Sequence, residues 1–146
     1  ALDSPVAPTR AEAALALGRR EALGAIPRIR ALVEDKEPVV VSAALDALAW
    51  LGDSDVAKAV ERALTHPDDE IFQAGLRAAR TLPVHDAERL VSRGLAHAAW
   101  NVRMLAIKLL LDLDTERTRL VLRRALTDET DSMVRHAIES GLQMGV

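Results

Sequence analysis

The stretch Pro38–Asp53, which reads PVVVSAALDALAWLGD, decides the architecture of this chain. Small and aliphatic residues recur in it at the spacing of one buried helix face, and Gly52 stands where the helix should end. A proline at the start is tolerated, because a residue of the first turn has no intrahelical N–H bond to lose. We therefore predict a short amphipathic helix with the inward residues Val40, Ala44, Ala47, Leu48 and Leu51.

The same pattern recurs along the chain with a nearly constant period. Counted from Val40, the inward positions fall 4, 7, 8 and 11 residues later, and the equivalent starts are Ile71, Val102 and Val134. These starts step by 31, 31 and 32 residues, and Ala7–Gly18 is a degenerate first copy. A period of this size predicts stacked helical pairs, because one pair cannot bury its own apolar face.

A second helical run follows each of these helices after a short break. The runs are expected near residues 21–34, 55–65, 86–96 and 116–127. Polar residues stand where they should begin and can cap free backbone N–H groups: Ser54, Asp55, Asp86, Thr115 and Glu116. No alternating strand pattern is flanked by hairpin turns. The whole chain is therefore predicted to be helical.

The composition fits this interpretation. Hydrophobic residues make up 49% of the 146 residues but aromatic ones only 2%, so the core is built from aliphatic side chains and alanine. Cysteine is absent, which fits a reducing, cytoplasmic compartment, and no apolar run reaches the ~20 residues of a membrane span. The net charge is −3, whereas a nucleic-acid-binding chain is usually basic. The start at Ala1 without Met fits a processed protein or a fragment of a longer one.

These repeats resemble the HEAT-like repeats in their short bacterial form, as in the PBS-lyase HEAT-like group. The resemblance rests on the 40–52 pattern above, on Val102–Arg103 with Ala106, Leu109 and Leu110, and on Val134–Arg135. The chain departs from the family where Val41 and Phe72 replace an expected Arg, and where Pro83 and Asp114 stand at the position of Gly52. The resemblance implies that the second helices line a concave surface.

The expected fold is therefore an all-α, right-handed α–α superhelix, or solenoid, of about four HEAT-like helical pairs plus a terminal helix. We expect one domain over residues 1–146. Its repeats cover about residues 6–36, 38–67, 69–98 and 100–128, and the terminal helix covers residues 132–143.

Basic side chains recur on the face of the second helices that is opposite the predicted core. Residues four apart on a helix point the same way, and neighbouring helices pack ~8–10 Å apart, so these side chains should form a Lys/Arg ladder. Such a ladder suits an acidic protein surface or phosphates. The alternative is an ordinary solvated helix face. The predicted partner-binding residues are Lys58, Arg62, Arg89, Arg93, Arg123 and Arg124.

Apolar side chains off the core axis provide a second candidate surface. Leu45, Leu76 and Ile107 share one repeat position and are expected to wedge between neighbouring first helices. Met104 and Leu111 are harder to bury and are a possible apolar interface with a partner, a second copy or a missing part of a longer chain. Trp100, placed on the loop before Val102, is a candidate interface anchor.

No catalytic, cofactor or metal site is expected. His66 and His97 occupy equivalent positions, in a column with Asp35 and Asp128, but repeats ~10 Å apart cannot share a metal whose ligands lie ~2 Å away. The expected role of these histidines is that of a cation near a helix C-terminus. Ser42, Ser92 and Ser140 have no base beside them in the sequence.

We predict a non-catalytic protein–protein interaction scaffold that presents a curved helical surface to an acidic partner. Nucleic acid and membrane are not the expected partners, and no feature fixes the oligomeric state. Two alternatives stay open by analogy with other HEAT-like proteins. One is a nucleic-acid-binding protein related to DNA alkylation-repair glycosylases. The other is an accessory subunit of a bilin-lyase-type enzyme.

Overall fold

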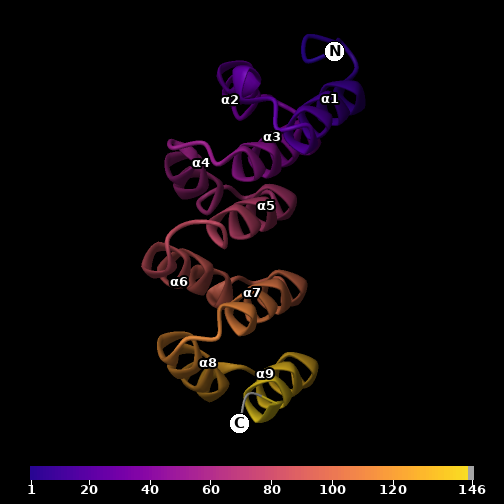
Figure 1. Ribbon diagram of the computed structural model, residues 1–146. Helices are drawn as coiled ribbons and strands as arrows, with labels where there is room; N and C mark the ends of the chain where they lie inside the picture. Colours follow the sequence, from indigo (N-terminus) through magenta and orange to yellow (C-terminus); the bar gives the residue numbers. More distant parts are fainter. Residues whose placement is uncertain (145–146) are drawn as a thin grey trace. The chain divides into compact units, whose positions relative to one another are not determined.

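A computed structural model of the chain describes residues 1–144, and this part is helical without strands (Figure 1). The predicted all-α, HEAT-like helical-repeat fold is confirmed. The elements of the described part are α1 (Ala7–Arg19), η1 (Leu23–Ala25), α2 (Ile26–Leu32), α3 (Pro38–Leu51), α4 (Val56–Ala63), α5 (Asp69–Ala79), α6 (Val84–Ser92), η2 (Arg93–Ala96), α7 (Trp100–Leu113), α8 (Glu116–Asp128) and α9 (Ser132–Met144). None of these helices is long and apolar enough to cross a membrane.

The chain divides into two compact units, Ala1–Thr81 (unit 1) and Leu82 onward (unit 2). In unit 1 the first helices α1, α3 and α5 pack in succession, and the second helices α2 and α4 pack on α3 and on α3 and α5 respectively. In unit 2, α7 packs on α9, while α6 and α8 contact each other and α7. Each unit is therefore a layer of first helices beside a layer of second helices (Figure 1).

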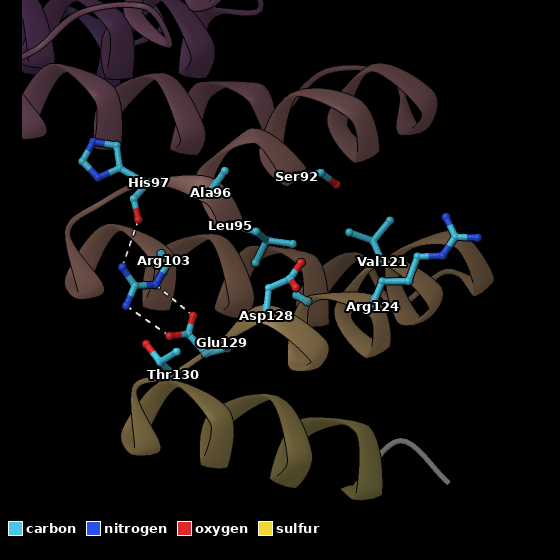
Figure 2. A pocket seen from close by; sticks show the side chains of 11 residues that line it. Ser92, Leu95, Ala96, His97, Arg103, Val121, Arg124, Asp128, Glu129 and Thr130 are labelled. Carbon is cyan, nitrogen blue, oxygen red and sulfur yellow. Dashed lines mark hydrogen bonds and ion pairs between the residues drawn. The ribbon is translucent and has the colours of Figure 1, made fainter.

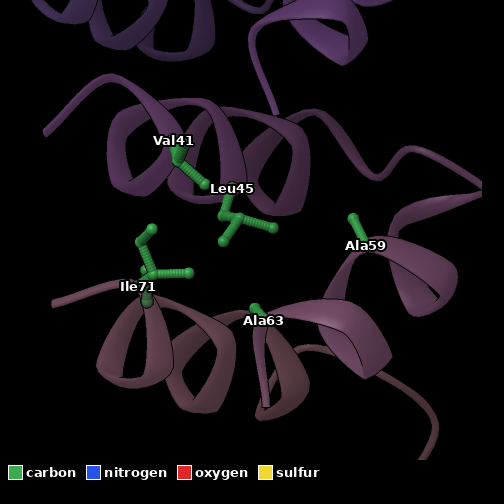
Figure 3. Packing of buried hydrophobic residues seen from close by; sticks show 6 residues of the cluster. Val41, Leu45, Ala59, Ala63 and Ile71 are labelled. Atoms are coloured by element: carbon green, nitrogen blue, oxygen red, sulfur yellow. The ribbon is translucent and has the colours of Figure 1, made fainter. Parts of the chain in front are cut away.

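The core of each unit is made of small and aliphatic side chains. Below the second helices of unit 1, a cluster of Val41, Leu45, Ala59, Ala63, Ile71 and Ala74 joins α3, α4 and α5 (Figure 3). Leu45, Leu76 and Ile107 are buried, as predicted for residues that wedge between helices. Gly75 of α5 allows close packing, since a Cβ there would lie 2.9 Å from the Cβ of Ala63 on α4.

The helix starts differ in whether a side chain caps the free backbone N–H groups. Thr115 accepts a hydrogen bond from the N–H of Thr118 and forms the capping box of α8. Asp55 precedes α4 without a capping hydrogen bond, so the prediction for its side chain was wrong; it pairs with Arg30 instead. Asp68 caps α5, because its side chain accepts from the N–H groups of Glu70 and Ile71.

Two first helices end at a left-handed residue. Gly52 closes α3 with φ +67° and Asp114 closes α7 with φ +47°. Asp is one of the few residues other than Gly that tolerate this region. Asp114 therefore fills the role of Gly52, although it departs from the family pattern.

Candidate functional site

Each unit has a surface groove lined by residues of two successive second helices. The groove of unit 1, the unit-1 groove, lies over the cluster of Figure 3 and has a volume of about 190 Å³. Its lining includes Val33, Glu34, Ala59, Arg62 and Ala63. A neighbouring hollow of about 160 Å³ shares Val33, Ala59 and Arg62 with it.

The groove of unit 2, the unit-2 groove, is larger. It has a volume of about 540 Å³ and lies between α6–η2 and α8, with Arg103 of α7 at one end (Figure 2). Half-buried Leu95 and Val121 give it apolar walls. A second hollow, lined by His85, Arg89 and Arg117, shares Ser92 and Val121 with it. The unit-2 groove is therefore continuous with this second hollow along α6 and α8.

The predicted basic residues are all solvent-exposed on the second-helix layers. In unit 1, Arg62 forms an ion pair with Glu34. In unit 2, Arg89 approaches Asp86 on its own helix at 3.6 Å. Within the described part of the chain, neither Arg123 nor Arg124 has an ion-pair or hydrogen-bond partner. The exposed residues are Lys58, Arg62, Arg89, Arg93, Arg123 and Arg124.

Arg30, another basic residue of the second helices in unit 1, is held in ion pairs within the protein. Both guanidinium donors of Arg30 on α2 bond the carboxylate of buried Asp53, Nε at 3.0 Å, and Arg30 also lies 3.5 Å from Asp55. The hydrogen bond from Arg30 holds the pKa of Asp53 below its usual range, despite the opposing effect of burial. Arg30 is thus engaged within the protein rather than available to a ligand.

A second bidentate pair borders the unit-2 groove. Arg103 donates to Glu129 at 2.9 and 3.2 Å and to the carbonyl of His97 at 2.9 Å (Figure 2). It also donates to the carbonyl of Ala98 at 2.8 Å. Burial alone would raise the pKa of Glu129, but hydrogen bonds from the Asp131 N–H and from Arg103 outweigh it and lower the pKa. Arg103 therefore ties α7 to the segment that follows α8. In unit 1, Arg10 and Asp35 form a corresponding bidentate pair.

The histidine column has a local structural role. Nδ1 of His66 accepts the N–H of Asp68 and Nδ1 of His97 accepts the N–H of Ala99, both at 3.0 Å. Asp35 accepts the N–H of Glu37 in the same way. Each ring therefore accepts a backbone N–H in the turn before the next first helix.

Ser140 does have a histidine beside it, contrary to the sequence-based expectation. Its Oγ lies 3.2 Å from Nε2 of His136 on the same face of α9. Both groups of this hydrogen bond lie at the exposed surface, and within residues 1–144 no carboxylate pairs with the His136 ring. The i,i+4 spacing was the signal that sequence reasoning missed.

The candidate apolar residues have different surroundings. Trp100 is 52% exposed, but it is the first residue of α7 rather than part of a loop, so that part of the prediction was wrong. Met104 follows one turn later and is half-buried. Leu111 packs against α9, since a Cβ at Gly141 would lie 2.3 Å from its Cδ1. Only Trp100 of these three presents a large exposed surface.

The geometry therefore provides two grooves that are lined by aliphatic and charged side chains. The family model for HEAT repeats matches residues 1–80. No curated protein sequence matches the chain. HEAT repeats generally mediate protein–protein interaction, and HEAT-repeat scaffolds are typically non-enzymatic. Because the match covers more than half of the 146 residues, the chain belongs to the family of HEAT-repeat proteins.

Proposed function

We propose that this chain is a non-catalytic scaffold that binds an acidic surface of a partner protein through the exposed basic residues of its second helices. The observation that carries the proposal is the state of Arg123 and Arg124. Both are exposed on α8, and neither has a partner in the described part of the chain. Exposed, unneutralised arginines favour carboxylates, which they can bind through two parallel hydrogen bonds.

The surroundings of these arginines support a protein partner. The same surface has half-buried aliphatic residues, Leu95 and Val121, which can pack against apolar side chains of a ligand. The whole chain carries a net charge of −3, so a long polyanion would be attracted to this surface and repelled elsewhere. An acidic patch on a folded protein or on a peptide fits the local charge better.

The test is affinity capture from a lysate of the source organism, with captured proteins identified by mass spectrometry. One variant carries Arg62→Glu, Arg93→Glu and Arg124→Glu on the second helices. A matched control carries Arg20→Glu, Lys36→Glu and Lys108→Glu, three exposed basic residues outside these helices. Both variants change the net charge equally, so their difference reports on the surface alone.

We expect an acidic protein to be retained by the original chain and by the control, and lost by the second-helix variant. Circular dichroism should show the same helicity for all three. Equal loss in both variants would mean that only net charge matters and would contradict the proposal. Retention by both variants would also contradict the proposal, and exposed Trp100 would then be the next candidate for the binding site.

A further inference from the structure

The unit-1 and unit-2 grooves are formed by equivalent positions of two different repeats. Their lining residues are offset by two repeat periods in the sequence, and most residues that line the first groove have an equivalent in the lining of the second. Val33 corresponds to Leu95, Ala59 to Val121 and Ala63 to Ala125. The equivalent of Arg62 is Arg124. The side chains of the two grooves can therefore be compared position by position.

In the unit-1 groove the arginine already holds a carboxylate. Glu34, just after α2, reaches across to Arg62 of α4, and the two side chains are 66% and 63% exposed. The pair thus joins successive second helices over the apolar residues Val33 and Ala59. The position of the Glu34 carboxylate shows where an acid can bind the arginine of this groove.

In the unit-2 groove the carboxylate is missing. The equivalent of Glu34 is Ala96, which is exposed and lines the same groove as Arg124. Arg124 has no partner within the described residues, and Figure 2 shows its guanidinium turned away from Asp128. Glu129, the other acid of the groove, is neutralised by Arg103. An arginine and an apolar wall are therefore left open to solvent.

We infer that the unit-2 groove binds an extended acidic segment of a partner protein, with one ligand carboxylate at Arg124 in the place that Glu34 takes at Arg62. An aliphatic neighbour of that acidic residue packs on Leu95 and Val121. The inference rests on the proposed function and names the type of ligand and its anchor. A nucleic-acid strand fits less well, because its phosphates would run along a groove that also contains Asp128.

The sharpest test places the missing acid back in the protein. Ala96→Glu gives the unit-2 groove the side chain that already occupies the unit-1 groove, at an exposed position that leaves the core intact. The matched control is Asn101→Glu, which adds the same charge at an exposed position of α7 outside the groove lining. A third variant, Arg124→Gln, removes the anchor while it keeps a polar side chain.

The probe is a short fluorescein-labelled peptide of alternating glutamate and leucine, followed by fluorescence anisotropy. A second peptide with glutamine in place of glutamate shows how much binding depends on the carboxylates. We expect Ala96→Glu and Arg124→Gln each to weaken binding of the acidic peptide by about 5-fold, the equivalent of one solvent-accessible ion pair. Asn101→Glu should bind as the original chain does, and the glutamine peptide should bind weakly to all.

The outcomes separate the inference from the proposed function. If Ala96→Glu and Asn101→Glu weaken binding equally, or if neither does, the unit-2 groove is not the site. The proposed function then survives only if the triple second-helix variant still loses the peptide. If that variant also binds normally, both fail. Displacement of the peptide by single-stranded oligonucleotide, with steep salt dependence, would assign the surface to nucleic acid and overturn the inference.

Discussion

The grooves of the two units are built from the same repeat positions, yet the arginine of one is paired with an acid of the protein itself and the arginine of the other is not. In unit 1, Glu34 neutralises Arg62, and Asp53 and Asp55 neutralise Arg30. In unit 2 the equivalents of these acids are Ala96, Thr115 and Arg117. The comparison teaches that a repeat protein can keep one scaffold throughout and still leave an arginine without an internal acid in one repeat, by the replacement of a single glutamate with alanine.

The largest expected effect comes from the core below each groove. Leu45 in unit 1 and Ile107 in unit 2 are equivalent and at most 2% exposed. Replacing either with Ala leaves a cavity and should cost about 2–5 kcal/mol of unfolding free energy. Trp50 lies in unit 1 and Trp100 in unit 2, so denaturant unfolding followed by fluorescence of single-tryptophan variants reports on each unit. A change below about 1 kcal/mol at either site would show that the two cores are not alike.

The next effect concerns Arg103, which borders the unit-2 groove where unit 1 has Val41. Arg103→Lys keeps the charge but loses the bidentate contact with Glu129 and the two carbonyl bonds. We expect a loss of about 1–3 kcal/mol, measured by urea denaturation with Trp100 fluorescence. The control Lys108→Arg, at an exposed site of the same helix, should be neutral. Equal stability of both variants would mean that Arg103 does not brace the groove.

A smaller effect is expected at the starts of the second helices. Thr115→Val removes the hydroxyl that caps α8 and that also donates to buried Glu88, whereas Asp55→Ala changes a residue that does not cap α4. The first should cost about 1–2 kcal/mol and the second less, apart from the exposed contact of Asp55 with Arg30. Thermal unfolding by circular dichroism makes the comparison. The reverse order would show that the α4 start is the better capped of the two.

The smallest effect, which vanishes in acid, is expected from Asp53→Asn in unit 1. The pKa of Asp53 is lowered in the folded chain, so its charge stabilises the fold above the unfolded value near ~4, and this contribution is lost as the pH falls through the lower folded pKa. The variant should therefore be less stable than the original at pH 7 and converge with it in acid. Guanidinium titrations at several pH values, with Trp50 as the probe, test this. A gap that does not narrow in acid would contradict the Arg30–Asp53 interaction as its source.

Local spacing was enough to predict the helices. Pro38–Leu51 was located to the residue, because proline, a period of helical spacing and Gly52 all act within one segment. The second helices were placed to within a few residues, except that residues 21–34 contain a 3-10 turn before α2. The caps were less predictable. Asp55 and Asp68 both look suitable in sequence, but Arg30 engages the first and leaves only the second to cap a helix.

The candidate site was only partly predictable. The exposed basic residues of the second helices follow from the same periodicity that gave the buried face. Their neutralisation does not, since Arg62 of α4 meets Glu34, which follows α2, with the whole of α3 between them in the sequence. The column Glu34, Thr65 and Ala96 supplies an acid in one repeat and none in the next two, so by itself it points to Arg93 and Arg124 alike. Only the contacts in the folded chain separate these two arginines.

The sequence by itself determined the repeat period, the helical fold, the composition of the core and the face that stays exposed, because these depend on residue spacing within single helices. Only the tertiary structure decided which arginines are already paired. Ion pairing depends on how neighbouring helices and their connecting turns are juxtaposed, over a few ångströms that no spacing rule supplies. Arg62 and Arg124 illustrate this, since each begins the same Arg-Ala-Leu-Thr sequence. Arg62 nevertheless pairs with Glu34, whereas the lining of the unit-2 groove has Ala96 at the position of that acid.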